Sequence, residues 1–239
     1  MTQMTKELFL EDSYLKECEA EIIAIDEDKI TLDQTVFYPA GGGQESDTGI
    51  LIQDGIAVEV ISVKKEGGKI VHTVRDPDKL TSGPVTARID WERRNQSMKH
   101  HTLLHVLAAV FHEDHNSLCT GNQILPDKAR IDLTGITELS KDEIEKLVER
   151  ANQEITRNHE VSVRKLPRAE AEQISGMIKT IVNLIPEGVK EIRLVKIGDI
   201  DEQACGGTHV NETQAVGQCV LDKVKNKGKG VTRLEVRIV

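Results

Sequence analysis

Two pairs of residues with metal-binding side chains are the most informative feature of the sequence. His101 and His105 lie four residues apart within "HTLLH", and Cys205 and His209 lie four residues apart within "CGGTH". In a helix, side chains four apart project from one face about 6 Å from each other, so both imidazoles can reach one ion. Protein-bound zinc takes three or four nitrogen or sulfur ligands. The two pairs therefore predict one Zn2+ per chain, held by these four residues.

Other arrangements of the histidines fit a metal site less well. A zincin protease places a glutamate directly after the first histidine of its motif, and here that position is Thr102. His112 lies seven residues beyond His105, about 10 Å along a helix, which is too far for both to bind one ion. Surface or supporting positions are expected for His72, His100 and His159, and a buried apolar position for Cys219.

The elements that must position these ligands fall into two parts. Residues 20–91 alternate apolar and polar side chains and are interrupted by Asp54-Gly55 and Gly67-Gly68, which is typical of short strands in a small β-barrel. From residue 91 the apolar period becomes helical, which places "HTLLH" on a helix. We therefore expect an N-terminal β-barrel domain at 1–91 and a zinc-binding domain at 92–239.

The second part mixes helices and strands. Ser140 and Glu143 form a candidate capping box ahead of a helix at 141–160, and a shorter helix is expected at 167–175. Apolar alternation predicts strands at 160–166, 191–197, 218–224 and 233–239. The expected fold class is α+β, with helices packed on a largely antiparallel sheet.

Composition limits the classes of protein to consider. Of 239 residues, 38% are hydrophobic and 30% charged, which indicates a globular chain, and the four cysteines are widely spaced, as in a reducing compartment. Because no signal peptide or membrane-spanning run is apparent, a cytoplasmic location is expected. A formal net charge of −9 argues against broad binding to nucleic acid, although it does not exclude a local basic patch.

One such patch lies near the C-terminal end. Its sequence is "KVKNKGKGVTR", where Gly228 and Gly230 favour a tight turn that would bring neighbouring lysines together. A solvated charged hairpin explains this pattern as well as an RNA contact does. The residues assigned to an RNA backbone contact are Lys225, Lys227, Lys229 and Arg233.

Three motifs in order, "FYPAGGGQESDTG", "HTLLH" and "CGGTHV", resemble the editing domain of alanyl-tRNA synthetases and its free-standing relatives, the AlaX proteins of medium length. The resemblance covers nearly the whole chain. It implies a trans-editing aminoacyl-tRNA hydrolase that deacylates mischarged tRNA(Ala), chiefly seryl-tRNA(Ala) with glycyl-tRNA(Ala) as the second candidate, at the zinc site. Leu103 stands where many relatives have alanine, and Thr232-Arg233 stands where they have paired arginines.

Substrate contacts are expected at two further places. By itself the "GGGQ" run, Gly41, Gly42, Gly43 and Gln44, would be a flexible turn, since glycine permits positive φ. The resemblance places it against the editing cleft, where Gln44 contacts the adenosine end or supports the pocket. Thr120 is expected to line the pocket and to recognise serine through its hydroxyl.

Two other functions fit the same residues. The four ligands would equally close a structural zinc site in a nonenzymatic tRNA-binding module, or serve a zinc hydrolase of small esters. The residues also leave open the general base, the oligomeric state, and whether zinc activates water or positions substrate. An intact synthetase is not expected, since these residues contain no Gly-rich phosphate loop with Lys-Ser/Thr and leave no room for an activation domain beside the other two.

Overall fold

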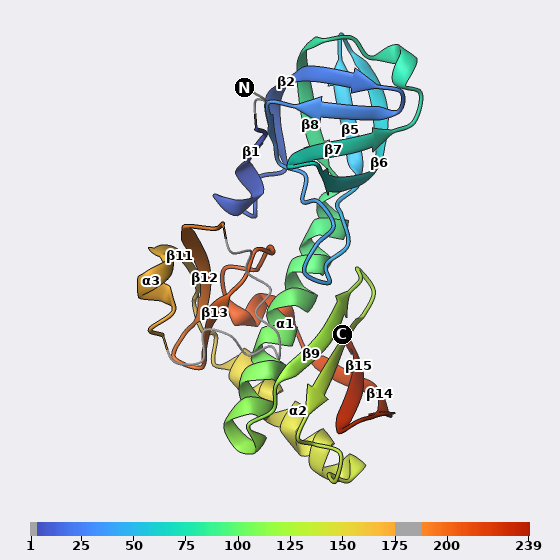
Figure 1. Ribbon diagram of the computed structural model, residues 1–239. Helices are drawn as coiled ribbons and strands as arrows, with labels where there is room; N and C mark the ends of the chain where they lie inside the picture. The colour runs from blue at the N-terminus through green and yellow to red at the C-terminus, as the bar shows by residue number, and fades with distance from the viewer. Residues whose placement is uncertain (1–3, 175–187) are drawn as a thin grey trace. The chain divides into compact units, whose positions relative to one another are not determined.

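The computed structural model describes residues 4–174 and 188–239 (Figure 1). The chain divides into two compact units, Met1–Ser97 and Met98–Val239. The first is built around a closed barrel and the second combines helices with antiparallel sheets, so the predicted α+β fold is confirmed. Among the described residues, no helix combines the length and the apolar composition needed to cross a membrane.

The barrel of the first unit has six strands in the order β2-β3-β7-β6-β5-β8, each antiparallel to its neighbours. Apolar side chains from alternate positions fill its interior, where Ile22, Ile30, Leu51 and Val60 are fully or almost fully buried. Its strands are β2 (Glu17–Asp26), β3 (Lys29–Leu32), β5 (Gly49–Gln53), β6 (Ile56–Glu66), β7 (Lys69–Val74) and β8 (Gly83–Ile89), with short β1 (Lys6–Glu7) and β4 (Gln34–Thr35) paired in parallel.

His72 lies inside this barrel, so the position predicted for it, at the surface or in support of the metal ligands, is wrong. Its side chain is completely buried and ends a chain of hydrogen bonds. The Phe37 amide donates to Thr35 Oγ1 (3.1 Å), which lies 2.9 Å from His72 Nε2, and His72 Nδ1 donates to the Ile30 carbonyl (3.1 Å). Burial lowers the pKa of His72 to about 4, so the ring is neutral and its Nε2 accepts from the Thr35 hydroxyl.

The first turns of α1 (Trp91–His115) belong to the first unit, where Arg94 is buried. Its guanidinium pairs with Asp47 and donates to the carbonyls of Ser13 (2.8 Å) and Val36 (2.6 Å). Asp47 in turn accepts from the Tyr38 amide at 2.7 Å. The buried pair therefore joins the ends of the 38–47 loop, which carries the "GGGQ" run.

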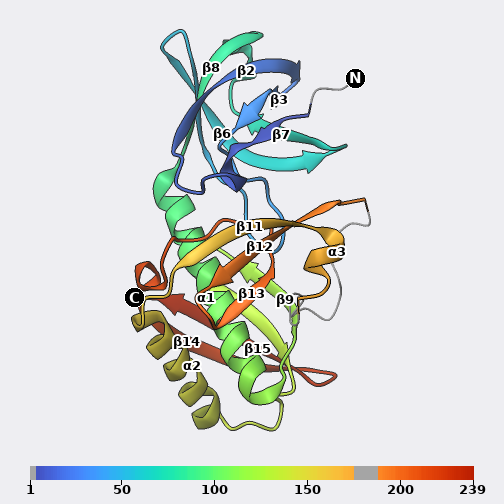
Figure 2. The ribbon, with the colours of Figure 1, turned by 90° about the vertical axis from the view of Figure 1, so that its left-hand side faces the viewer.

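The second unit has two antiparallel sheets. The larger has the order β14-β15-β10-β9 and the smaller β11-β12-β13. Their strands are β9 (Cys119–Ile124), β10 (Ala129–Thr134), β11 (Val161–Pro167), β12 (Glu191–Ile197), β13 (Asp201–Ala204), β14 (Cys219–Gly228) and β15 (Val231–Ile238). From Met98 onward, α1 runs between the two sheets in Figure 1 and in Figure 2, which shows the same ribbon turned by 90°. Residues of α1 from 101 to 111 are all buried, because both sides of the helix are covered.

The remaining helices follow the predicted signals with different lengths. The capping box is formed, since Ser140 Oγ accepts from the Glu143 amide and the Glu143 carboxylate accepts from the Ser140 amide. The helix that follows, α2 (Lys141–Thr156), packs against β14 and ends earlier than predicted, before a positive φ of 56° at Asn158. The expected helix at 167–175 is only α3 (Arg168–Ala171), and residue 175 lies outside the described residues.

Candidate metal centre

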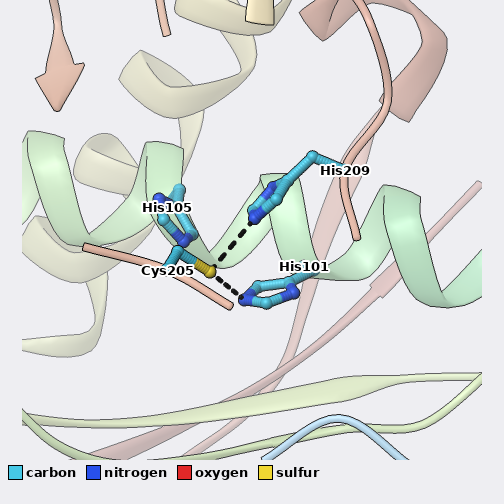
Figure 3. Close-up of side chains that lie close together, drawn as sticks. All are labelled: His101, His105, Cys205 and His209. Atoms are coloured by element: carbon cyan, nitrogen blue, oxygen red, sulfur yellow. Dashed lines mark hydrogen bonds between the residues drawn. The ribbon is translucent and has the colours of Figure 1, made fainter. Parts of the chain in front are cut away.

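The structure brings the four predicted ligands together in the second unit (Figure 3). His101 and His105 project from α1, while Cys205 directly follows β13 and His209 lies in the loop beyond it. One potential ligand atom from each residue lies within 4.8 Å of all the others. Cys205 Sγ is 3.3 Å from His209 Nε2 and 3.5 Å from His101 Nε2.

These separations match the geometry that a tetrahedral ion requires. With Zn–N near 2.0 Å and Zn–S near 2.3 Å, a nitrogen and a sulfur on the same tetrahedral ion lie about 3.5 Å apart. Three imidazoles and one thiol are also donors that zinc accepts, whereas magnesium and calcium prefer oxygen. The residues present therefore fit a bound zinc ion in both type and spacing.

Backbone contacts fasten the loop that carries Cys205. Arg193 on the neighbouring strand β12 donates through Nη1 to the carbonyls of Cys205 (2.7 Å) and Gly207 (3.1 Å). The Cys205 amide returns a hydrogen bond to the Arg193 carbonyl at 3.2 Å. The Gly207 amide points at Cys205 Sγ at 3.4 Å, where it favours the thiolate. These hydrogen bonds fix the backbone of residues 205–207.

The electrostatics of the centre favour the metal-binding forms of Cys205 and His209, whereas His105 must lose a proton to bind metal. Burial raises the pKa of the Cys205 thiol, but the imidazoles of His101 and His209 lower it more, so the net pKa is well below its usual value. Burial, and then the charge on His101, lower the pKa of His209 to about 3. Burial also lowers the pKa of His105, but hydrogen bonds to Asp201 and Cys205 outweigh it and raise the pKa to about 9. A thiolate and a neutral imidazole are the states that coordinate metal.

A small pocket of about 60 Å3 opens beside two of the ligands. Apolar side chains form most of its wall, and the amides of Asn122 and Gln203 provide polar groups. The lining residues are His101, Leu104, His105, Ala108, Cys119, Asn122, Ile124, Ile131 and Gln203. A cavity of this size has room for only a few heavy atoms next to the metal ligands.

Thr120, expected in this pocket, is not among its lining residues. It is exposed, and its hydroxyl donates to the Asp132 carbonyl at 3.3 Å. The cause is a bulge in β9: Gly121 pairs with Asp132 but Cys119 pairs with Leu133, so Thr120 is an extra residue. The bulge turns Cys119 inward and Thr120 outward, while Asn122 keeps its place at the pocket.

The "GGGQ" run forms a tight turn in the first unit. Gly41 and Gln44 exchange backbone hydrogen bonds of 3.0 Å, and the Tyr38 hydroxyl donates to the Gly41 carbonyl at 2.9 Å. Between them, Gly42 and Gly43 take positive φ values of 59° and 88°. The Gln44 side chain is buried, with 2% of its surface exposed, so it supports the turn from inside.

The basic segment forms the hairpin between β14 and β15. Lys225, Lys227 and Lys229 are exposed, and Gly228, Lys229 and Gly230 all have positive φ at the turn. Arg233 differs from the lysines, because both branches of its guanidinium donate to Asp132 of β10, at 2.6 and 2.7 Å. The structure thus gathers three of the four assigned residues as exposed charges and places the fourth in an ion pair.

Several residues that support the metal ligands escaped the sequence analysis. Asp201 and Gln203 contact His105, and Thr102 contacts His209. One available signal was the alternation of Asp201, Gln203 and Cys205, which puts all three on the same face of a strand. Neither Arg193 nor Thr102 carried a comparable signal, because their partners lie far away in the sequence.

Comparisons with known proteins find two family models in this chain. The model described as tRNA synthetases class II (A) matches residues 4–93. The model described as the threonyl and alanyl tRNA synthetase second additional domain matches residues 192–235. The second match spans Cys205 and His209.

Curated relatives are similar over almost the whole chain. The alanyl-tRNA editing protein AlaX-M of Saccharolobus solfataricus is 39% identical over 97% of this chain and 98% of its own length. AlaX-M of Methanosarcina acetivorans is 38% identical, also over 97% and 98%. The alanine–tRNA ligase of Pyrococcus furiosus is 40% identical over 96% of this chain, but only 25% of the ligase is covered. The chain thus spans the length of the editing proteins and about a quarter of the ligase.

Proposed function

This chain belongs to the family of AlaX-M alanyl-tRNA editing proteins, and from this we propose that it hydrolyses the ester bond of tRNA(Ala) carrying a wrong amino acid. Serine is the chief substrate in this proposal and glycine the second. One Zn2+ per chain is held by His101, His105, Cys205 and His209. Because the substrate is an intermediate of translation, the proposal includes a cytoplasmic location.

The observation that carries this proposal is the small pocket beside the metal ligands. Its volume of about 60 Å3 suits small amino acids such as glycine, alanine and serine and excludes large ones. His101 and His105 form part of its wall, so an amino acid bound there lies next to the metal centre. A purely structural zinc site has no need for such a pocket.

Polar groups in the pocket provide a means to separate serine from alanine. Gln203 donates through Nε2 to Asp201 at 2.9 Å, so its amide oxygen is the atom available to accept from a serine hydroxyl. Asn122 offers a second amide at the same pocket. A methyl group forms no hydrogen bond and fills the space in which water can meet the amides beside glycine, so alanine leaves the buried amide of Gln203 unmet and weakens transition-state binding. Asn122 therefore takes the role first assigned to Thr120.

Zinc bound at the cluster would polarise the ester carbonyl, activate water or hold the substrate amine. The residues around it perform the other tasks. The apolar wall keeps bulk water from the ester, and the fastened 205–209 loop holds the ligands in place. Lys225, Lys227 and Lys229 contact phosphates of the tRNA, while the Gly41–Gln44 turn contributes to binding its adenosine end.

Deacylation of seryl-, glycyl- and alanyl-tRNA of alanine identity tests the proposal. We expect hydrolysis of the first two, little hydrolysis of the third, and loss of activity when the metal is chelated. Rates equal to those in buffer at saturating enzyme would favour the nonenzymatic tRNA-binding module. Equal activity on free seryl esters and on seryl-tRNA would favour the hydrolase of small esters.

A pair of variants in β9 tests the pocket itself. Asn122→Ala should lower kcat/KM for seryl-tRNA about fivefold, since one hydrogen bond is worth roughly 1 kcal/mol, and leave glycyl-tRNA unchanged. Thr120→Ala is the matched control two residues away on the outer side of the bulge, and it should change neither rate. A selective loss on seryl-tRNA in Thr120→Ala would return the recognition of serine to that residue.

A further inference from the structure

His105 has a carboxylate on the side of its ring that faces away from the other ligands. Its Nδ1 lies 2.9 Å from Asp201 Oδ2, and both side chains are buried, with 7% of His105 and 4% of Asp201 exposed. Gln203, also buried, donates through Nε2 to the same carboxylate oxygen at 2.9 Å. A buried carboxylate is costly unless its oxygens accept hydrogen bonds or face a positive charge.

The geometry decides which nitrogen of His105 carries the proton. An ionised carboxylate can only accept, so Nδ1 at 2.9 Å must be the donor. The Gln203 amide nitrogen also lies 3.1 Å from His105 Nδ1, and because Nδ1 carries the proton that binds Asp201, this is a contact between two donors. With the proton on Nδ1, the lone pair of a neutral His105 ring is on Nε2.

His209 also has its Nδ1 against a hydrogen-bond partner, but this partner is the neutral hydroxyl of Thr102. Its Nδ1 lies 3.1 Å from Thr102 Oγ1, which also accepts from the Val210 amide at 3.3 Å, while its Nε2 points at Cys205 Sγ. Both histidines thus direct Nε2 toward the cluster. The Nδ1 of His209 faces a hydroxyl, and the Nδ1 of His105 faces a carboxylate. Of these two histidines, His105 is the one with a full negative charge one imidazole away from the cluster centre.

Charge balance gives a reason for this difference. A divalent ion among three neutral imidazoles and one thiolate leaves a net charge of +1 in a buried site, which is unfavourable. Asp201 supplies the second negative charge without occupying a coordination position. The same carboxylate fixes the His105 ring, so a single residue both orients a ligand and neutralises the centre.

We propose that Asp201 is a positioning residue of the metal centre, which sets the His105 tautomer and balances the charge of the bound ion. This inference rests on the metal site of the proposed function and not on its substrate. It assigns a graded order of importance, in which the anionic partner Asp201 contributes more to metal affinity than the neutral partner Thr102.

Metal affinity measured by chelator competition tests the inference. Asp201→Ala removes both the hydrogen bond and the charge and should weaken zinc binding about 10- to 100-fold. Asp201→Asn keeps the shape and an accepting oxygen but loses the charge, so an intermediate loss is expected. Thr102→Val, which removes a buried hydroxyl with little change in shape, should lose less than Asp201→Ala.

Glu202→Gln is the matched control for loss of a negative charge. It is the next residue along β13, and its carboxylate pairs with Arg164 at 2.6 Å, away from the ligands. Its zinc affinity should equal that of the unmodified protein. Because Asp201→Asn is isosteric, it keeps the comparison valid if Asp201→Ala does not fold.

A spectroscopic readout separates positioning from a general loss of stability. In the zinc-loaded protein, 15N NMR of the imidazole rings should show His105 with a proton on Nδ1 and the metal on Nε2, and Asp201→Ala should weaken or remove that proton signal. Unchanged zinc affinity in Asp201→Ala, or metal on Nδ1, would overturn the inference. A protein that binds zinc in this way but spares aminoacyl-tRNA would instead refute the proposed function.

Discussion

The hairpin between β14 and β15 supports a quantitative prediction about tRNA binding. Replacing Lys225, Lys227 and Lys229 together by alanine removes three exposed charges close to one turn. Each phosphate contact that is lost reduces the slope of log affinity against log salt by about 0.7 for single strands to 0.9 for duplex. Three contacts together should therefore reduce the slope by about 2 to 3.

Arg233 is excluded from this sum because of its partner. Both branches of its guanidinium bind Asp132, and the side chains are only 17% and 15% exposed. The pair carries no net charge toward a phosphate. Arg233→Ala should thus change the salt slope by much less than 1, although the same residue looks equivalent to the lysines in the sequence.

The measurement is equilibrium binding of tRNA(Ala) at a series of salt concentrations. Between about 50 and about 200 mM salt, the unmodified protein should lose roughly 20- to 40-fold more affinity than the triple variant. The variant should also have a raised apparent KM for seryl-tRNA and still bind one zinc ion.

The barrel contains a matched control for charge loss on a hairpin. Lys64, Lys65 and Lys69 flank the turn between β6 and β7, and their replacement by alanine removes the same formal charge from another hairpin, although Lys65 pairs with Glu7 at 2.7 Å. We expect the salt slope of this second variant to be unchanged. An unchanged slope in the first variant would refute the hairpin as an RNA contact, and a reduced slope in the second would move tRNA docking to the barrel.

The barrel yields two further predictions. Burial lowers the pKa of His72 from 6.5 to about 4, so the unfolded chain binds the proton more readily and stability falls as the pH is lowered between these values. The free energy of unfolding should fall by about 2 kcal/mol by about pH 5. Denaturant titrations should show this fall in the unmodified protein and not in His72→Gln. If the free energies of unfolding of both proteins depended on pH in the same way, the buried neutral ring would be contradicted. Arg94→Met should lower the free energy of unfolding by about 3–5 kcal/mol, since it leaves Asp47 buried without its ion partner. Calorimetry would show whether the double variant with Asp47→Leu recovers part of this loss, as coupling between the two residues requires.

Local patterns in the sequence were sufficient for the features that depend on near neighbours. The spacing of His101 and His105 places both on one helix face, and the glycines at 228 and 230 mark the hairpin turn, whatever the rest of the fold does. The Ser140–Glu143 capping box is equally local and is formed as predicted. These features follow from short-range geometry, in which a few residues determine one another's positions.

Pairing between distant segments decided the rest. Asp201 meets His105 across 96 residues, and Arg233 meets Asp132 across 101, because β13 lies beside α1 and β15 is paired with β10 in one register. Because of the bulge at Thr120, Cys119 faces the pocket and Thr120 does not. Closure of the barrel buries His72. Strand register is set by the packing of the whole sheet, and a shift of one residue reverses every side chain. The sequence by itself therefore determined the metal-binding residue types, while the partners that set their protonation, charge and accessibility depended on tertiary structure.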